Sequence, residues 1–206
     1  MTSRAKTEIR AYGIRALQAR HPEVRKLKRL HTPSVHGNKH WASSWLLMDY
    51  FRHHALPPGA RVMEIGCGWG LAGIYCAKKY GAIVTSVDID PEVFPYLCLH
   101  ADLNKVRIAT LQKKFNRLQK SHLRDFDIVI GADICFWDKM VNPLKRFIRR
   151  ALHAGVQLVT IADPGRPTFE KISDYFVKKR RGEIQDWTVH RPRNFQGRLL
   201  TIKPPG

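Results

Sequence analysis

Acidic residues are scarce in this chain of 206 residues. Asp and Glu number 17 against 36 Lys and Arg, which gives a formal charge of +19 at pH 7. Such an excess of positive charge favours partners that carry negative charge, such as nucleic acid, an anionic membrane surface or an acidic protein. Hydrophobic residues still make up 44% of the chain, so it can bury a core, and a wholly disordered protein is excluded.

Cysteines and long apolar runs are also sparse. The four cysteines form no C-x-x-C pair, so no zinc knuckle, other metal site or disulfide framework is predicted. No apolar stretch approaches the ~18 residues that a membrane span needs, and the N-terminus contains no apolar signal region. These absences favour a cytoplasmic protein with reduced thiols. Residues 1–20 carry five basic residues and one acid, Glu8, so a mitochondrial presequence and the matrix remain the alternative.

Apolar, β-branched runs alternate with helical patterns from residue 61 onwards. The predicted strands are residues 61–65, 82–87, 106–111, 125–132 and 156–162, with 183–189 and 198–202 as a closing antiparallel pair. The predicted helices are residues 70–80, 91–104, 138–152 and 167–179. This alternation predicts an α/β protein with a doubly wound, mostly parallel seven-stranded sheet. Its ligands should lie beyond the carboxyl ends of the strands.

Residues 1–39 are predicted to be a basic N-terminal extension of a domain that spans residues 40–206. Within the extension, residues 3–20 can be read as a basic helix. The domain itself is expected to begin with a short apolar helix that runs through Phe51 and that Ser43 and Ser44 can cap.

The most informative stretch closes a strand, turns on glycines and opens a helix. Residues 68–73 (GWGLAG) match the G-x-G-x-x-G of dinucleotide-binding proteins, whereas residues 64–70 (EIGCGWG) match the acidic E/D-x-G-x-G-x-G loop of class I methyltransferases. Glu64 decides between them, because a carboxylate would repel a pyrophosphate but suits a cofactor with an ammonium and a sulfonium. A plain strand-to-helix turn is the alternative for this motif alone.

A second acid follows at the end of the next predicted strand. Asp88 lies about 20 residues after the glycine turn. At this position a carboxylate can accept hydrogen bonds from both hydroxyls of a ribose. Asp90, directly before Pro91, is better placed to cap the following helix. The two acids and the glycines together predict a binding site for S-adenosylmethionine.

Residues 131–137 (GADICFW), at the end of the fourth predicted strand, bear on the methyl acceptor. Many enzymes that methylate amino groups of nucleic-acid bases carry N/D-P-P-Y/F at this point, and this chain has no such motif. From Asp133 to Phe136 it reads D-x-x-F, which resembles the D/E-x-x-Y/F of the protein-lysine branch of the seven-β-strand methyltransferases.

Two further motifs extend this resemblance. Residues 163–167 (DPGRP) resemble the same motif in the lysine methyltransferases that act on the electron-transfer flavoprotein β subunit. Trp41, before an apolar helix, resembles the tryptophan of an N-terminal element that closes over the cofactor in that group. Sequences of this type are also described as nicotinamide N-methyltransferase-like. The resemblance covers residues 40–170, so residues 1–39 and 180–206 lie outside it and could hold the substrate specificity.

The resemblance implies transfer of a methyl group from S-adenosylmethionine to a nitrogen nucleophile. Of the two catalytic candidates, Asp133 would orient the amine beside an apolar wall formed by Phe136. A lone carboxylate also stabilises an ammonium, so the proton could leave through water instead. The predicted cofactor-binding residues are Trp41, Glu64, Gly66, Cys67, Gly68, Gly70, Asp88, Ile89 and Ala132. The predicted substrate-contacting residues are Trp137, Asp163 and Arg166.

The charge of +19 bears on the choice of partner. For a lysine methyltransferase, it favours an acidic or ribosome-associated protein as the substrate. An RNA methyltransferase whose basic arm contacts phosphates is one alternative, and a small-molecule, nicotinamide-like N-methyltransferase is another. A binding protein with a vestigial cofactor fold would be expected to lack Glu64, the glycines or Asp88, and all of them are present.

Overall fold

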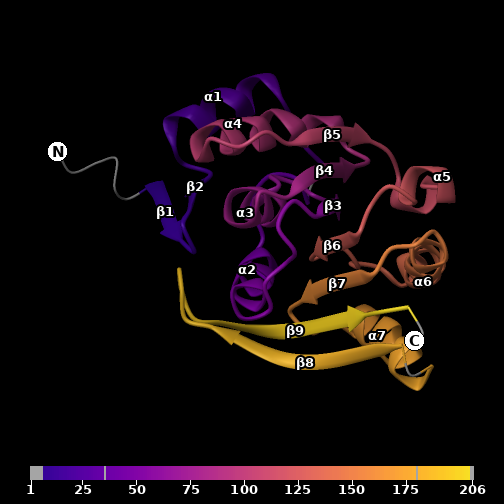
Figure 1. Ribbon diagram of the computed structural model, residues 1–206. Helices are drawn as coiled ribbons and strands as arrows, with labels where there is room; N and C mark the ends of the chain where they lie inside the picture. The colour runs from indigo at the N-terminus through magenta and orange to yellow at the C-terminus, as the bar shows by residue number, and fades with distance from the viewer. Residues whose placement is uncertain (1–6, 35, 180, 205–206) are drawn as a thin grey trace.

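The computed structural model describes residues 7–34, 36–179 and 181–204 (Figure 1). The central sheet has the strand order β5-β4-β3-β6-β7-β9-β8. Its strands are β3 (Arg61–Ile65), β4 (Ile83–Asp88), β5 (Ala109–Gln112), β6 (Ile128–Ala132), β7 (Leu158–Asp163), β8 (Gly182–Val189) and β9 (Phe195–Ile202). Strands β3 to β7 are parallel, and β9 runs antiparallel to both of its neighbours. The predicted mostly parallel, seven-stranded sheet is confirmed.

Helices cover both faces of this sheet, because successive strand residues point to opposite sides. Val62 packs into one apolar layer and its neighbour Met63 into the other. The helices of the first layer are α2 (Ser43–His53), α3 (Leu71–Tyr80) and α4 (Phe94–Asn104). Those of the second layer are α5 (Lys120–Leu123), α6 (Asp138–His153) and α7 (Pro167–Lys178). No helix of the described residues is long and apolar enough to cross a membrane.

Helix ends follow the local sequence closely, with one exception. Gly81 ends α3 in the left-handed conformation, as expected for a glycine at this position. Asp90 caps the 3-10 turn η2 (Pro91–Val93) by accepting a hydrogen bond from the backbone of Glu92. The predicted cap by Ser43 and Ser44 is wrong, because both residues lie inside helix α2 and its N-cap residue, Ala42, makes no side-chain hydrogen bond. The Ser43 N–H instead donates to the Asp133 carboxylate at 3.2 Å.

The N-terminal segment differs from its prediction. Residues 3–6 of the expected helix lie outside the described residues, and the rest forms an antiparallel hairpin of β1 (Glu8–Ala11) and β2 (Ile14–Leu17). Tyr12 and Gly13 connect the two strands with φ values of +55° and +78°. Two successive positive φ values make the tight hairpin turn that matches the twist of antiparallel strands. The hairpin leads into helix α1 (Pro22–Leu30), which is the helical part of the extension.

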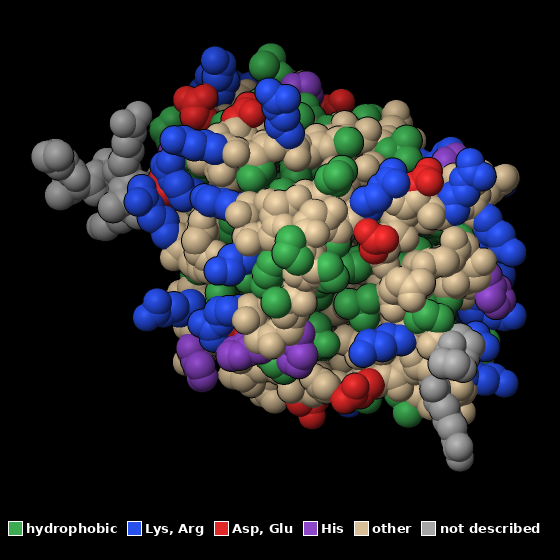
Figure 2. All heavy atoms as spheres, viewed as in Figure 1, with side chains coloured by type: hydrophobic (Ala, Val, Ile, Leu, Met, Phe, Trp, Pro, Cys, Tyr) green, Lys and Arg blue, Asp and Glu red, His purple; other side chains and the backbone are tan. Residues whose placement is uncertain are grey.

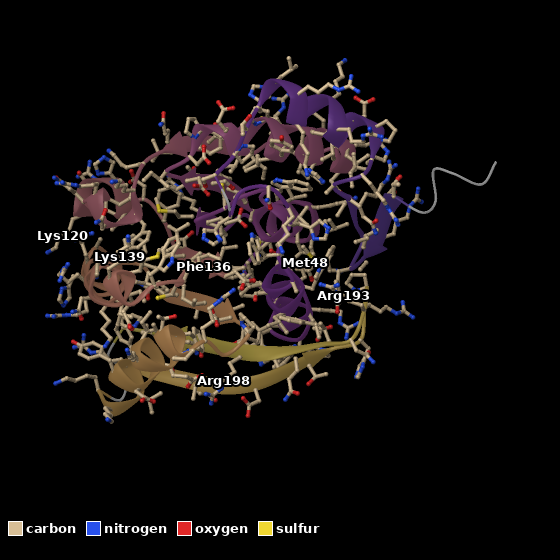
Figure 3. All side chains as sticks on the ribbon, turned by 180° about the vertical axis from the view of Figure 1, so that it is seen from behind. Met48, Lys120, Phe136, Lys139, Arg193 and Arg198 are labelled. Carbon is tan, nitrogen blue, oxygen red and sulfur yellow. The ribbon has the colours of Figure 1, made fainter. Side chains whose placement is uncertain are left out.

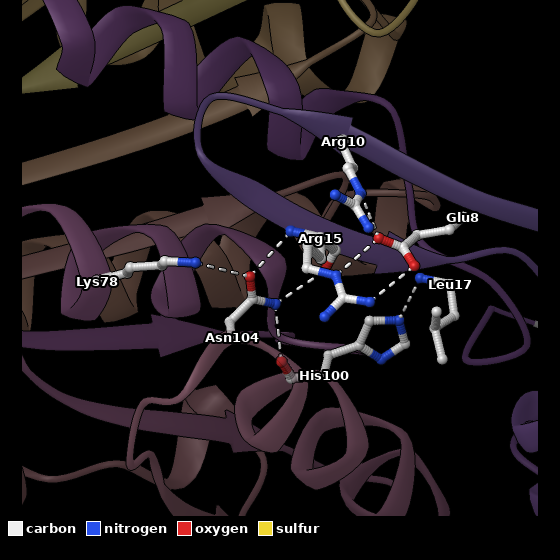
Figure 4. Close-up of polar contacts among 7 residues, drawn as sticks. All are labelled: Glu8, Arg10, Arg15, Leu17, Lys78, His100 and Asn104. Carbon is white, nitrogen blue, oxygen red and sulfur yellow. Dashed lines mark hydrogen bonds and ion pairs between the residues drawn. The ribbon is translucent and has the colours of Figure 1, made fainter. Parts of the chain in front are cut away.

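Polar side chains of α4 hold this hairpin on the domain (Figure 4). His100 Nε2 accepts a hydrogen bond from the Leu17 N–H at 3.0 Å. One turn further along α4, Asn104 accepts from the Arg15 N–H at 2.9 Å and donates to the Arg15 carbonyl at 2.8 Å. Arg15 itself forms two hydrogen bonds to the Glu8 carboxylate. His100 and Asn104 therefore satisfy the backbone of β2, and the N-terminal hairpin packs as part of the folded domain.

Candidate functional site

A cavity of about 610 Å³ lies beyond the carboxyl ends of β3, β4 and β6. Strand β3 has β4 on one side and β6 on the other, so the chain reverses its direction of travel across the sheet here. Such a switch point is where doubly wound sheets bind their ligands. All nine predicted cofactor-binding residues line the cavity, as do Asp133, Phe136 and Trp137.

The glycine loop forms the floor of this cavity. Gly66, Gly68 and Gly70 all have positive φ values, between +51° and +70°. At Gly68, a Cβ atom would meet no protein atom within 4 Å, so this position faces open space in the cavity. The loop therefore leaves room for a ligand to approach the backbone closely at Gly68.

Glu64 connects the loop to the start of α3. Its carboxylate is buried, accepts a hydrogen bond from the Ser86 hydroxyl at 2.9 Å, and accepts backbone hydrogen bonds from Ala72 and Gly73. Burial raises the pKa of Glu64 to about 7. A Cβ atom on Gly73 would lie 2.6 Å from Glu64 Oε2, so this glycine permits the contact. Glu64 thus caps a helix whose own N-cap residue, Gly70, has no side chain.

Asp88 lies across the loop from Glu64. Its Oδ2 accepts a hydrogen bond from the Gly68 N–H at 3.0 Å, and its Oδ1 accepts one from the Asp90 N–H at 3.1 Å. Burial raises its pKa, and these hydrogen bonds oppose that rise. The backbone of Ile89 also donates to this carboxylate, which still has lone pairs that can accept a hydrogen bond from a hydroxyl group in the cavity.

The loop before α2, residues 31–34 and 36–41, also borders the cavity. Trp69 supports this loop by donating to the Gly37 carbonyl at 2.9 Å and by stacking on Tyr96 at a centroid distance of 5.2 Å. Next to it, His40 lines the cavity, and burial lowers its pKa to about 4. His40 Nδ1 is buried and has no hydrogen-bond partner among the described residues. A neutral imidazole with an unused ring nitrogen can therefore bind a polar group of a ligand.

Aromatic side chains form the opposite wall. Phe136 stacks on His36 at a centroid distance of 4.1 Å and meets Trp41 edge-on at 5.4 Å. Trp137, beside it, is 49% exposed. The structure thus brings Trp41 together with Phe136 and Trp137, which lie 95 and 96 residues further along the chain. Sequence reasoning missed His36, since a single histidine in a loop carries no pattern.

Asp133 lies at the base of this wall in a fixed position. It is 5% exposed, has a φ of +55°, and its Oδ1 is 2.7 Å from Arg166 Nη1. The same Arg166 nitrogen is 2.7 Å from Asp163 Oδ2, and the guanidinium lies 4.5 Å from the centre of the Phe136 ring. Arg166 and Asp163 do not line the cavity and lie behind Asp133, where they neutralise and hold it.

Comparisons with known proteins agree with this geometry. Residues 62–155 match the methyltransferase domain family. The chain is 25% identical over 142 residues to the electron transfer flavoprotein beta subunit lysine methyltransferase of Xenopus laevis. The aligned region covers 65% of this chain and 56% of that protein. It is 32% identical over 104 residues to the calmodulin-lysine N-methyltransferase of Arabidopsis thaliana, covering 47% of this chain and 34% of that protein.

Solved structures show the same fold. The human methyltransferase 10 domain containing protein superposes with a TM-score of 0.58 at 12% identity, covering 77% of this chain and 82% of that one. Together, the sheet order, the glycine loop and these matches support a class I S-adenosylmethionine-dependent methyltransferase. The chain spans a little more than half the length of its Xenopus relative.

Proposed function

We propose that this chain transfers a methyl group from S-adenosylmethionine to the side-chain amine of a lysine in a protein. The observation that carries the proposal is one cavity that joins the Gly68–Asp88 floor to the aromatic wall at Phe136. The chain's similarity to two protein-lysine methyltransferases supports lysine as the acceptor. A cytoplasmic location, consistent with the absence of C-x-x-C pairs, belongs to the same proposal.

The residues of the cavity fit the cofactor. Asp88 would accept the ribose hydroxyls, and the open face of Gly68 would admit the cofactor beside the loop backbone. His40 Nδ1 would gain the hydrogen-bond partner that it lacks, and Trp41 would cover the bound molecule from the loop before α2. When bound, S-adenosylmethionine supplies a methyl group activated by a positively charged sulfur.

The chain's own residues would orient the acceptor and exclude water from it. Asp133 carries a charge that Arg166 compensates, so we assign it a positioning role: its carboxylate would hold the amine beside the Phe136 ring. Fixed groups of this kind lower the entropic cost of bringing two reactants together. An uncompensated carboxylate would instead stabilise the charged ammonium, which is not nucleophilic.

Deprotonation of the acceptor can be assisted by the rim of the cavity. A free lysine has a pKa of about 10.4, so most of it is protonated at neutral pH. Four lysines line the cavity, namely Lys39, Lys113, Lys114 and Lys139. Nearby positive charges and removal from water both favour the neutral form of an amine. The rim would therefore promote loss of the acceptor's proton to water while attracting an acidic or ribosome-associated protein.

A labelling experiment tests this function. The protein is incubated with methyl-tritiated S-adenosylmethionine and a cell lysate, and the products are divided between protease and nuclease treatment. We expect label that survives nuclease, is lost with protease, and is recovered as methylated lysine after hydrolysis. Label that is lost with nuclease would support RNA methylation instead, and label that passes a dialysis membrane before either treatment would support a small-molecule acceptor. An Asp88→Ala variant, which should bind the cofactor at least tenfold more weakly, serves as the control and should transfer less label at a limiting cofactor concentration.

A further inference from the structure

A surface beside the cavity has a strong excess of unpaired positive charge. Residues 113–150 contain ten basic and four acidic residues. Besides Lys139, which lies over the Trp137 ring, six of the basic residues are exposed and form no ion pair with any carboxylate of the described chain: Lys114, Arg117, Lys120, Arg124, Arg146 and Arg149. Lys and Arg side chains gather along the edge of the molecule where α5 and α6 lie (Figure 2). We call these six residues the cationic face.

The carboxylates of the same segment leave this charge uncompensated. Asp133 is buried against Arg166, and Asp138 pairs with Lys171 of α7. Asp127 accepts a hydrogen bond from the backbone of Arg61 at the start of β3. Asp125 and Asp127 form no ion pair in the described residues, so at most two negative charges of this segment offset the six positive charges of the cationic face.

The elements that carry the cationic face are held together. The 3-10 turn η3 (Phe115–Arg117) packs on α6 through the rings of Phe115 and Phe147, whose centroids are 5.8 Å apart. Arg150 of α6 donates to the carbonyls of Asn116 and Leu118 at 3.1 and 2.5 Å. Helix α5 also contacts α6. These contacts fix the relative positions of the charges on η3, α5 and α6, so a ligand meets a preformed surface.

This face continues to the mouth of the cavity. Lys114 belongs to the face and lines the cavity, where Lys139 lies 5.4 Å from the ring centre of the half-exposed Trp137. Figure 3 shows Lys120 and Lys139 on the same side of the molecule as Phe136, with Arg193 on the opposite side. A basic surface next to an exposed aromatic ring is the arrangement that binds single-stranded nucleic acid, by phosphate contacts and base stacking.

We propose that the cationic face binds the phosphate backbone of single-stranded RNA and that Trp137 stacks on one of its bases. Four of the six residues are arginines, whose guanidinium groups can donate two hydrogen bonds to one phosphate. An exposed indole can stack on a nucleic-acid base, and every nucleotide offers such a ring beside its phosphate, whereas the acidic residues of a peptide carry none. RNA binding by this face does not depend on the proposed function. The proposed function enters only in identifying the methyl acceptor, which would be a lysine of a protein bound to RNA.

Fluorescence anisotropy with a labelled 20-nucleotide single-stranded RNA, measured without methyl donor, tests the proposal. Each phosphate contact contributes a slope of about −0.7 to log affinity against log salt for single strands, so six contacts give about −4. The variant Arg117→Glu/Lys120→Glu/Arg146→Glu should bind at least tenfold more weakly. Because three contacts are lost, its slope should be less negative by about 2. Trp137→Ala should weaken binding and leave the slope unchanged.

A matched control carries the same change in charge at another place. The variant Arg25→Glu/Lys26→Glu/Lys28→Glu alters α1, which lies over α4 and away from α5 and α6 (Figure 1). It should bind the RNA nearly as the wild type does. Equal losses in both variants would overturn the proposal, because net charge rather than the cationic face would then explain binding. Binding of polyglutamate in preference to RNA would also overturn it. Neither result depends on methyl transfer, so both leave the lysine function untouched.

Discussion

Arg166 Nη1 lies 2.7 Å from Asp133 Oδ1, and this contact joins the turn after β7 to the turn after β6. The second oxygen of Asp133 accepts the Ser43 N–H of α2, so three separate parts of the chain meet at one carboxylate. Asp133 also has a φ of +55°, a conformation that costs an L-residue roughly 1–2 kcal/mol. The ion pair and the hydrogen bond hold the residue in this strained position beside the cavity.

Replacing Arg166 tests how much this arrangement stabilises the fold. Arg166→Met leaves the buried carboxylates of Asp133 and Asp163 uncompensated, and breaking such a pair costs about 3–5 kcal/mol. We expect a decrease of this size in the free energy of unfolding by urea at pH 7.5. Adding Asp163→Asn should recover part of it. An unchanged free energy of unfolding in Arg166→Met would contradict the assigned role.

The close approach of Gly73 to Glu64 leads to a second prediction. In an ordinary helix, Gly→Ala stabilises by about 1 kcal/mol. At position 73 the added methyl would lie 2.6 Å from Glu64 Oε2 and 3.0 Å from Val84 Cγ1, so Gly73→Ala should destabilise the protein despite the better helix propensity. Combining it with Glu64→Asp, which withdraws the carboxylate, should give less than the sum of the two losses. Additive losses in urea denaturation would show that the two residues do not interact.

The pKa of Glu64, raised by burial to about 7 from its ordinary 4.5, makes stability depend on pH. The folded protein holds this proton more tightly than the unfolded chain, so the contribution is fully present below about pH 4.5 and is lost as the pH rises to about 7. His40, with its pKa lowered to about 4, acts in the opposite direction. The comparison is therefore between the wild type and Glu64→Gln, in which His40 is unchanged.

Between pH 5 and pH 7 the wild type should lose stability relative to Glu64→Gln, and above pH 8 the difference should be constant. Urea denaturation at four pH values between 5 and 8.5 measures this difference. Parallel curves across the whole range would mean that Glu64 is already ionised in the folded protein at pH 5.

The sheet and the floor of the site follow from local sequence patterns. The apolar strand runs, the glycine turn and the position of Asp88 each depend on a few neighbouring residues, and the strand order places them at one edge. The hairpin at Tyr12 and Gly13 was missed because its pattern is short and basic, and because α4 supplies the hydrogen bonds that stabilise it. Tertiary contacts of this kind leave no periodicity in the segment that they hold.

The surroundings of Asp133 illustrate the same limit. The D-x-x-F pattern singled out Asp133 and Phe136, and the D-P-G-R-P motif singled out Arg166. Neither motif indicated that Arg166 would pair with Asp133, because the two residues are 33 positions apart and meet only when β6 and β7 are adjacent. A substrate contact and a support behind the site look alike in sequence, since both place a charged side chain after a strand.

Binding of S-adenosylmethionine, measured by isothermal titration calorimetry, tests the central claim most directly. The wild type should bind one molecule of cofactor per chain. Asp88→Ala should bind at least tenfold more weakly, because hydrogen bonds to a charged group contribute about 1.5–3 kcal/mol each. Asp133→Asn, the control, should retain the wild-type affinity, and circular dichroism should show that both variants are folded. A wild-type protein that binds no cofactor, or a folded Asp88→Ala variant with unchanged affinity, would contradict the account.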